Sequence, residues 1–388
     1  MSTGCALNCL VCGKCASLPI LEVFSDADIA TQANERREGY GISVDLGTTT
    51  AVLALVDLNS GTVITRQSFI NPQRIFGPDV ISRIDAANKG SLNEMRGLIS
   101  QTINHAVNEL TAAAGASPEK IIDVVIAGNT TMIYLLLGLP CESLGVLPFI
   151  PAHNLSNKYL YNDIFGITSI NCEVKIFPWF SAFVGGDVMA GLVFVSLMEK
   201  QRFIFLDLGT NGEMVLYDDG KLIITSTAAG PAFEGIEQGG ASSTISKLAK
   251  LLRNGVIDDT GFLSNELVFT QKQVRNLQLA KSAIRSGLEI LLLEGGLAYD
   301  DVDAVYLPGG IAQAMNVADA VKIGLIPYQL ENKAFSIGNS SLGGAVRFLT
   351  TPTRTAKTIN SLYKNFTEIN LAAHRNFNDM FMEYMFFG

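Results

Sequence analysis

Two short segments of similar composition carry residues that could bind phosphate and a metal ion. Residues 44–50 read V-D-L-G-T-T-T and residues 206–213 read L-D-L-G-T-N-G-E, each after an apolar run. In both, an aspartate would close a buried strand, and the glycine permits a tight turn because it lacks a Cβ. The amides and hydroxyls that follow would face outward as donors to an anion. Strands often end in D-x-G, so one such turn has little weight. Two of them predict a polyphosphate site with Mg²⁺ between Asp45 and Asp207.

The residues after each segment predict the elements that position these turns. Each copy continues with two strand-like runs joined by a turn that ends in glycine: residues 50–56, 59–61 and 62–70 in the first, and residues 213–217, 218–220 and 221–227 in the second. A glycine turn between β-rich runs is typical of a hairpin. The whole arrangement occurs twice, which indicates a duplicated α/β unit. Neither copy is a Walker A loop, because the pattern G-x-x-x-x-G-K-S/T does not occur in the sequence.

Length and composition limit the class of protein. A chain of 388 residues is long enough for two domains, or for two halves of a duplicated one. The mean hydropathy of +0.29 is high. We nevertheless expect no transmembrane helix, because the longest uncharged run, residues 124–141, is interrupted at residues 128–131. The cysteine-rich N-terminus does not resemble a signal peptide. A net charge of −9 argues against a nucleic-acid partner, which needs a basic surface. We therefore expect a soluble, acidic protein of the cytoplasm.

Four of the six cysteines are crowded near the N-terminus, at Cys5, Cys9, Cys12 and Cys15. In a cytosolic protein this crowding indicates a metal site rather than disulfides. Closely spaced thiolates with small or apolar spacers favour an iron–sulfur cluster of the 4Fe–4S type, because zinc sites usually pair two C-x-x-C units across a longer loop. The first three cysteines also have the radical-SAM spacing, which we reject because that class needs a barrel after the motif. Zinc stays open, as does a cluster shared between subunits or with a partner.

Other segments could reach the same site. Residues 121–127 form a predicted buried strand that delivers Gly-Asn-Thr-Thr at residues 128–131 to a strand end, where α/β proteins bind ligands. A second predicted strand, over residues 302–307, ends in Pro-Gly-Gly at residues 308–310. Small residues at 340–345 open a predicted last helix and permit close contact with another helix.

The order of these motifs resembles that of the acetate and sugar kinase, Hsp70 and actin superfamily. The sequence contains a first phosphate motif, a first connecting helix, a second phosphate motif, an adenosine motif and a second connecting helix, at residues 44–50, 186–197, 205–213, 307–310 and 342–348. Five further segments resemble the reductive activators of corrinoid proteins: residues 71–73, 79–84, 127–132, 185–187 and 228–235. The likeness covers roughly residues 40–388.

This resemblance implies a fold and an activity. The fold would be α/β, a duplicated actin-like or ribonuclease H-like ATPase fold of two halves around a nucleotide cleft, preceded by a short Cys-rich segment. The activity would be ATP-dependent reduction of a corrinoid protein of a methyltransferase system from Co(II) to Co(I). A low-potential donor would supply the electron through the iron–sulfur cluster, and a homodimer is a further expectation. The relatives carry ferredoxin domains, whereas this chain has only its tetracysteine segment.

The turn chemistry and the resemblance together suggest roles for individual residues. Asp45 and Asp207 would hold Mg²⁺ and position the attacking water, and Asp187 is a candidate to orient that water. The phosphates would be bound by the two turns and the adenosine side by the glycines after residue 308. The nucleotide-binding set is then Gly47, Thr48, Thr49, Thr50, Gly209, Thr210, Asn211, Gly212, Gly309 and Gly310.

The predicted organisation has five parts. They are a Cys-rich segment (1–16), a linker (17–39), a first ATPase half (40–198), a second ATPase half (199–350) and a helical tail (351–388). In the tail, five apolar or aromatic residues fall on one helical face, which we expect to pack as core on the second half rather than dock a partner: Phe377, Met380, Phe381, Tyr384 and Met385.

Two other functions stay open. One is a small-molecule kinase of the same superfamily, which would need no cysteine cluster. The other is an ATP-sensing regulatory protein whose cysteines bind structural zinc.

Overall fold

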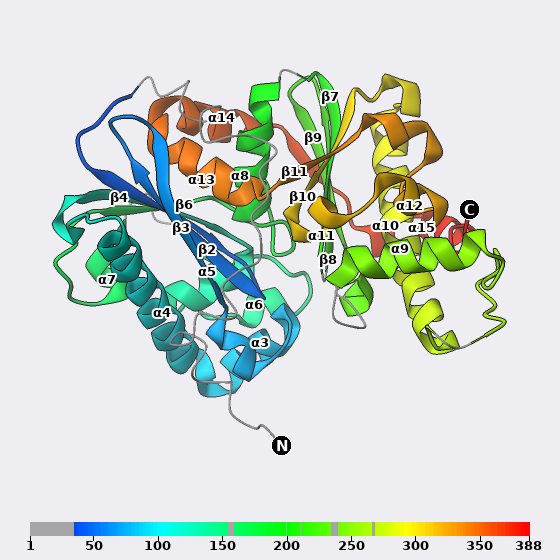
Figure 1. Ribbon diagram of the computed structural model, residues 1–388, viewed down its shortest axis with the longest axis horizontal. Helices are drawn as coiled ribbons and strands as arrows, with labels where there is room; N and C mark the ends of the chain where they lie inside the picture. The colour runs from blue at the N-terminus through cyan, green and yellow to red at the C-terminus, as the bar shows by residue number, and fades with distance from the viewer. Residues whose placement is uncertain (1–34, 154–158, 199, 210, 234–239, 266–267) are drawn as a thin grey trace. The chain divides into compact units, whose positions relative to one another are not determined.

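The computed structural model describes residues 35–153, 159–198, 200–209, 211–233, 240–265 and 268–388 (Figure 1). Within them the chain forms two compact units. The first contains residues 35–194 together with Ser340–Ile359, and the second contains Val195–Asn339 together with Asn360–Gly388. Residues 340–350, which the sequence analysis assigned to the second half, thus lie in the first unit. The Cys-rich segment and most of the linker lie outside the described residues.

The first unit is built on a mixed sheet of six strands. In sheet order the strands are β3 (Thr62–Ile70), β2 (Thr50–Asp57), β1 (Tyr40–Leu46), β4 (Ile121–Gly128), β6 (Glu173–Ile176) and β5 (Tyr159–Leu160). The pairs β1–β2 and β2–β3 are antiparallel, whereas β1–β4 and β4–β6 are parallel. The helices are α3 (Val80–Ala86), α4 (Leu92–Ala113), α5 (Thr130–Leu137), α6 (Glu142–Gly145), α7 (Tyr161–Phe165), α8 (Gly186–Val195), α13 (Ser340–Thr350) and α14 (Pro352–Lys364), the last of which continues into the second unit.

Helices cover both faces of this sheet. The apolar face of α4, which includes Met95, Ile99 and Ile103, is buried and packs with Leu53 and Leu55 of β2. The alternate β2 residues, Val52 and Ala54, pack with Leu342 of α13 on the opposite face. Figure 1 shows α4 and α13 on these opposite faces. Successive strand residues point to opposite sides, so a continuous apolar run such as β2 is required when both faces are covered.

The second unit repeats the order of five of the six strands of the first, and the sixth strand lies at the opposite end of the sheet. Its sheet runs β11 (Ala334–Gly338), β10 (Ala304–Pro308), β7 (Arg202–Leu208), β8 (Asn211–Asp218), β9 (Lys221–Ala228) and β12 (Phe366–Glu368). The meander β7–β8–β9 corresponds to β1–β2–β3, and β10 pairs with β7 in parallel as β4 pairs with β1. The helices are α9 (Gly240–Arg253), α10 (Gln271–Gly295), α11 (Gly309–Ala314), α12 (Val317–Lys322) and α15 (Phe377–Glu383). The predicted duplicated α/β architecture is confirmed.

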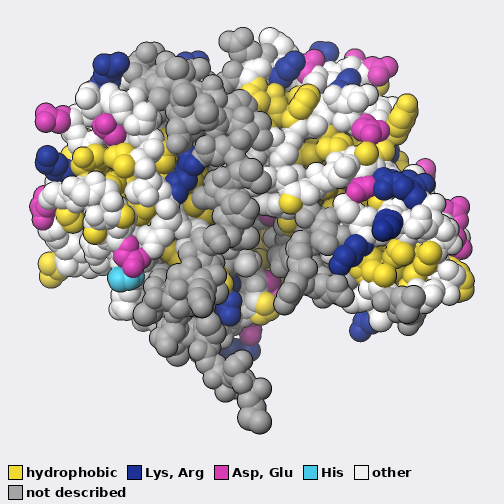
Figure 2. Space-filling view, in the orientation of Figure 1, with side chains coloured by type: hydrophobic (Ala, Val, Ile, Leu, Met, Phe, Trp, Pro, Cys, Tyr) yellow, Lys and Arg dark blue, Asp and Glu magenta, His cyan; other side chains and the backbone are white. Residues whose placement is uncertain are grey.

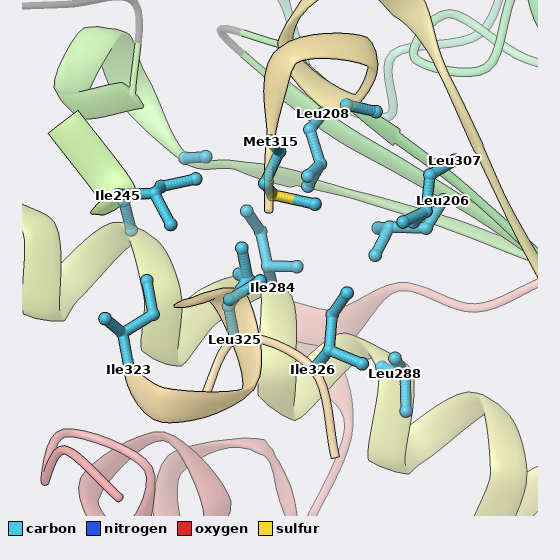
Figure 3. Close-up of a cluster of buried hydrophobic side chains, with 14 of the residues drawn as sticks. Leu206, Leu208, Ile245, Ile284, Leu288, Leu307, Met315, Ile323, Leu325 and Ile326 are labelled. Atoms are coloured by element: carbon cyan, nitrogen blue, oxygen red, sulfur yellow. The ribbon is translucent and has the colours of Figure 1, made fainter. Parts of the chain in front are cut away.

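The core of the second unit lies between its sheet and helix α10. Figure 3 shows side chains from the sheet, from α10 and from the segment after α12 converging on one cluster, which includes Leu206, Leu307, Ile284, Leu288, Ile323 and Leu325. Full burial of one such aliphatic side chain contributes roughly 1.5–3 kcal/mol. This cluster therefore holds the strands that carry the second turn.

The apolar face at the end of the C-terminal tail packs on the second unit as predicted, whereas residues 351–359 of the tail lie in the first unit. Met385 and Phe387 are buried, and Phe377 and Met380 are partly buried against the core cluster. The tail also contributes strand β12, which pairs in parallel with β9 and adds a strand to a segment predicted as helical. The purely helical description of this tail was incomplete, because a three-residue strand leaves no periodicity to detect.

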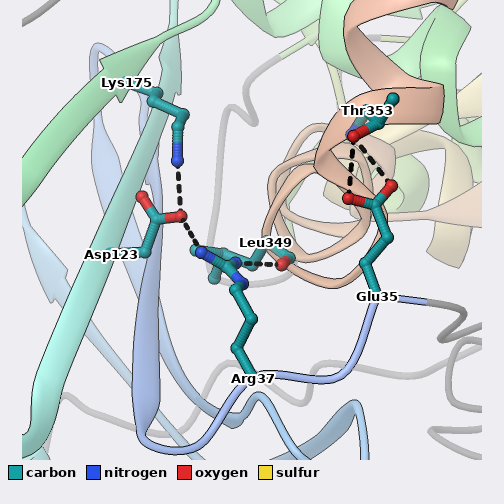
Figure 4. Close-up of polar contacts among 6 residues, drawn as sticks. All are labelled: Glu35, Arg37, Asp123, Lys175, Leu349 and Thr353. Atoms are coloured by element: carbon teal, nitrogen blue, oxygen red, sulfur yellow. Dashed lines mark hydrogen bonds and ion pairs between the residues drawn. The ribbon is translucent and has the colours of Figure 1, made fainter.

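The last residues of the predicted linker are fastened to the first unit. Arg37 contacts Asp123 and the Leu349 carbonyl, and Glu35 accepts two hydrogen bonds from Thr353 (Figure 4). The described chain is therefore anchored to α13 and α14 before β1 begins.

The surface carries both charge signs. On the face shown in Figure 2, Lys and Arg side chains are interspersed with Asp and Glu and with separate groups of apolar side chains. Among the described helices, none combines the length and apolar composition required to cross a bilayer.

Candidate functional site

The first turn begins at the carboxyl end of β1. Asp45 pairs with Ala127 of the parallel strand β4, so its carboxylate lies at the sheet edge where both strands end. The Gly47 amide donates to the Thr50 carbonyl oxygen at 3.1 Å and closes the turn. A Cβ at position 47 would lie 2.6 Å from that oxygen, which excludes any other residue. The turn is tight for the steric reason predicted.

Two asparagines hold this turn through hydrogen bonds. Asn71 is fully buried, and its Nδ2 donates to the Gly47 carbonyl oxygen at 2.9 Å while its own amide donates to the Thr49 carbonyl at 2.8 Å. Asn129 caps the N-terminus of α5, and its Nδ2 donates to Thr48 Oγ1 at 2.9 Å. Both residues lie in loops on which the family resemblance rests, but their contacts with the turn were not predicted.

The turn keeps backbone donors available for a ligand. Its carbonyl oxygens at Gly47 and Thr49 are used by Asn71. Within the described part of the chain, the amides of Thr48 and Thr49 have no hydrogen-bond acceptor, and Thr49 is exposed. Adjacent outward-facing amides are the donors that bind phosphate. The residues present here therefore fit a nucleotide phosphate.

Asp45 has a partner that sequence reasoning missed. The Ser341 hydroxyl at the start of α13 donates to Asp45 Oδ1 at 2.7 Å. Helix α13 approaches α8 closely, because a Cβ at Gly344 would lie 2.0 Å from the Ala190 carbonyl oxygen. The small residues of this helix permit close helix contact, as predicted. No sequence signal linked Ser341 to Asp45.

Asp187 lies on the segment that packs against the α5 N-terminus. A Cβ at Gly185 would lie 2.5 Å from Asn129 Cα and 2.7 Å from Asp187 Oδ1. Asp187 Oδ1 accepts a hydrogen bond from the Val188 amide at 2.9 Å. The chain of contacts from Thr48 through Asn129 to Gly185 thus brings Asp187 to the region of the first turn.

A buried arginine lies behind the same turn. Arg83 of α3 is fully buried, donates from Nε to the Gly77 carbonyl oxygen at 3.0 Å, and contacts Met132 Sδ from Nη1 at 3.3 Å. Burial lowers the pKa of the Arg83 guanidinium to about 10, although Asp79 opposes that shift. Asn71 Nδ2 contacts the same sulfur at 3.5 Å, so Met132 packs between Asn71, which holds the first turn, and Arg83 of α3.

The second turn has a related but separate environment. The Gly209 amide donates to the Asn211 carbonyl oxygen at 2.9 Å. Gly309 follows β10 with a φ of +84°, and a Cβ there would lie 3.2 Å from Asp207 Oδ1. The parallel pairing of β7 with β10 therefore places the predicted adenosine-side glycine beside the predicted metal ligand.

The predicted site residues fall into one set per unit. Asp45, Asp187 and the turn at residues 47–50 lie in the first unit. Asp207, Gly209, Asn211, Gly212, Gly309 and Gly310 lie in the second, and Thr210 lies outside the described residues. Gly212 is buried in the sheet, where a Cβ would lie 3.0 Å from Ile284 of α10, so its small size is also needed for packing.

The predicted cluster ligands Cys5, Cys9, Cys12 and Cys15 lie outside the described residues. The remaining cysteines, Cys141 and Cys172, are buried, and burial raises the pKa of each thiol to about 12. In the part of the chain that is described, no group of three or more His, Cys, Asp and Glu residues could hold a metal ion.

Two family models match consecutive parts of the chain. Residues 40–201 match the RACo middle region. Residues 201–244 and 256–388 match the C-terminal domain of RACo, the ASKHA domain. The chain belongs to the RACo family. The boundary between the two matched regions, at residue 201, directly precedes strand β7, so each matched region contains one of the two Asp-Leu-Gly turns.

Three known proteins are similar to most of this chain. The corrinoid activation enzyme RamQ of Eubacterium limosum is 29% identical over 92% of this chain and 72% of its own. The Co(II) methylated amine-specific corrinoid protein reductase of Methanosarcina barkeri is 22% identical over 88% of this chain and 76% of its own. The solved structure of a reductive activator for corrinoid, iron-sulfur protein is 29% identical, with a TM-score of 0.80 over 92% of this chain and 67% of that one.

Proposed function

We propose that this RACo-family protein is an enzyme that uses ATP to return a corrinoid protein from the inactive Co(II) state to Co(I) for methyl transfer. The observation that carries the proposal is the repeated glycine turn with its aspartate in a RACo fold, together with relatives named as corrinoid activation enzymes and reductases. Those names favour this activity over a small-molecule kinase.

The proposed nucleotide is ATP with Mg²⁺. Asp45 and Asp207 are assigned to the metal and to the position of the attacking water, with Asp187 as the acid that orients this water. The turns at residues 47–50 and 209–212 bind the phosphates, and Gly309 and Gly310 meet the adenosine side. Bound Mg²⁺ would neutralise charge on the transferred phosphoryl group.

Free energy from ATP is needed because the reduction of Co(II) to Co(I) is thermodynamically unfavourable. For a one-electron couple, about 59 mV corresponds to a tenfold change in equilibrium, or about 1.4 kcal/mol. A gap of a few hundred millivolts therefore requires several kcal/mol, which a ligand-driven conformational change can supply. One electron from a low-potential donor reduces Co(II) to Co(I), and ATP hydrolysis then releases the corrinoid protein.

The electron route is proposed to pass through an iron–sulfur cluster at Cys5, Cys9, Cys12 and Cys15. Such clusters reach very low potentials, and four thiolates are the ligand set of a 4Fe–4S cluster. Structural zinc is the competing assignment. The proposed partners are a corrinoid protein of a methyltransferase system, a low-potential electron donor and a second copy of this chain. The proposed location is the cytoplasm, where thiols stay reduced.

The test combines ATP hydrolysis with cobalt reduction. Purified protein is mixed anaerobically with a Co(II) corrinoid protein and a low-potential reductant, and the visible spectrum is followed. We expect Co(I) only when Mg²⁺ and ATP are both present. Asp45→Ala and Asp207→Ala should each lower ATP hydrolysis by about a hundredfold or more, as when one charge-stabilising group is removed. The exposed Asp85→Ala and Asp300→Ala are controls. Full ATPase activity in both site variants would refute the assignment.

A further inference from the structure

Ser341 is the residue that joins helix α13 of the first unit to the predicted metal ligand. Its hydroxyl donates to Asp45 Oδ1 at 2.7 Å, although the two residues are 296 positions apart in the chain. Ser341 lies in the first turn of α13, one residue after the chain passes from the second unit into the first. The hydrogen bond therefore connects Asp45 to the point where the chain passes from the second unit into the first.

Helix α13 is held rigidly enough to position this hydroxyl. Gly344 leaves no room for a side chain against the Ala190 carbonyl oxygen, and a Cβ at Gly343 would lie 2.6 Å from the Phe194 ring. On its other side α13 packs against β1, where Leu349 would meet a Cβ at Gly41 at 2.9 Å. A helix confined on two sides cannot shift without disturbing the position of Ser341.

Asp45 lies beside the N-terminal end of α13, because Ser341 in the first turn of that helix contacts it. The N-terminal end of an α-helix carries a partial positive charge that stabilises a nearby carboxylate. A hydroxyl that donates to one carboxylate oxygen also restricts rotation of that carboxylate. Metal ligands commonly depend on such outer contacts for their orientation.

We propose that Ser341 is a positioning residue for Asp45, an inference that rests on the proposed function. Its hydroxyl occupies one oxygen of the carboxylate and orients the other for Mg²⁺. We assign Ser341 no direct contact with the nucleotide or with the attacking water. Its influence on hydrolysis passes through Asp45.

The test compares side chains of matched shape. Ser341→Thr keeps the hydroxyl. Ser341→Val has nearly the same shape as the threonine variant but lacks the hydroxyl, and Ser341→Ala removes the hydroxyl without adding a methyl group. The neighbouring Ser340→Ala is the control on the same helix. The measurements are kcat and KM for ATP, the Mg²⁺ concentration for half-maximal activity, and equilibrium binding of a non-hydrolysable ATP analogue with and without Mg²⁺.

We expect Ser341→Ala and Ser341→Val to lower kcat about tenfold or more, the scale of one lost hydrogen bond to a charged group. The Mg²⁺-dependent part of analogue binding should weaken by a similar factor, while Mg²⁺-free binding and the Tm stay unchanged. Ser341→Thr and Ser340→Ala should behave as the unaltered protein. If the hydroxyl were needed only for folding, its removal would lower the Tm and would not weaken Mg²⁺-dependent binding selectively.

Two results would overturn the proposal. The first is equal kcat and equal Mg²⁺-dependent binding in the Thr and Val variants while Asp45→Ala is inactive. The second is faster hydrolysis or tighter Mg²⁺-dependent binding in Ser341→Val, which would mean that the hydroxyl competes with the metal. Full activity of Asp45→Ala would instead refute the role of Asp45 itself, and so separates failure of the proposed function from failure of the role of Ser341.

Discussion

The Arg37 guanidinium donates from Nη2 to the Leu349 carbonyl oxygen at 2.6 Å, across 312 positions of sequence. Its Nη1 donates to Asp123 at 2.7 Å, and Lys175 pairs with the same carboxylate (Figure 4). The Asp123 side chain is 2% exposed, so the two cations offset the cost of burying its carboxylate. Residues 35–37, where the described chain begins, are thus fixed near the end of α13.

Arg37→Ala should destabilise the first unit by about 2 kcal/mol, because it removes two charge-assisted hydrogen bonds but leaves Lys175 on Asp123. Arg37→Lys should recover only part of this loss, because one ammonium lacks the fork that spans Asp123 and Leu349. Urea unfolding at constant ionic strength measures both effects. The adjacent Arg36 is exposed, and its alanine variant should change stability by less than about 0.5 kcal/mol. Equal stability of the Arg36 and Arg37 variants would show that the anchor contributes nothing.

Replacing Cys9 and Cys12 with serine should abolish visible cluster absorbance and stop reduction of the corrinoid protein by its physiological donor. ATP hydrolysis should survive, because both predicted phosphate turns lie outside the N-terminal segment, one in each unit. An artificial low-potential reductant should restore Co(I) formation in this variant, but only with ATP present. Iron, sulfide and zinc analysis of anaerobically purified protein accompanies the assay.

Cys141→Ala is the matched control, since this thiol is buried and its pKa is raised to about 12 by burial. Its cluster absorbance should match that of the unaltered protein. If the double variant instead activates the corrinoid protein at the normal rate with the physiological donor, the N-terminal segment is not the electron route and structural zinc becomes the better assignment.

The stability of the second unit should depend on pH through Lys281. This lysine of α10 is 1% exposed, and its Nζ donates to the Tyr384 and Phe386 carbonyl oxygens. Burial, with a smaller effect of Arg285, lowers the pKa of Lys281 to about 7. An unfolded lysine titrates near about 10.4. Between these values the unfolded chain binds one more proton, so the free energy of unfolding should rise with pH, by up to about 1.4 kcal/mol per unit.

Below about pH 7 the lysine is charged in both states, and the folded state carries the full cost of burying it. We expect the unfolding free energy to rise by about 2 kcal/mol more in the unaltered protein than in Lys281→Met between about pH 7 and pH 9. Urea unfolding followed by the tyrosine signal measures the two slopes. Identical slopes would show that the folded pKa of Lys281 is not lowered.

Two adjacent phenylalanines of the tail allow an experiment to distinguish packing in the core from docking of a partner. Phe387 is 5% exposed and belongs to the core cluster, whereas Phe386 is 54% exposed. Phe387→Ala should lower stability by about 3 kcal/mol, and Phe386→Ala by less than about 1 kcal/mol. Truncation after Thr350 should give insoluble protein, because it removes β12 and α15. A soluble, ATP-binding truncation that no longer engages a corrinoid protein would make the tail a docking element.

The sequence by itself determined the two meanders and the aspartate–glycine turns. These features are local: alternating apolar residues set each strand, and a residue without a Cβ sets each turn. The hairpin at Asp218-Asp219-Gly220 illustrates this, since Asp219 and Gly220 take φ values of 44° and 90° that short polar residues and glycine tolerate. Because the pattern occurs twice, the sequence also indicated the duplication, and the two meanders have the same strand order.

Only the tertiary structure decided which distant residues complete the site. Asn71 and Asn129 reach the first turn, Ser341 reaches Asp45, and Gly309 lies beside Asp207. No periodicity records these contacts, because each depends on how whole helices and strands pack rather than on neighbouring residues. Helix α13 is the clearest case. Its sequence indicates a helix with small residues, but its membership in the first unit follows from the fit of Gly343 and Gly344 against α8.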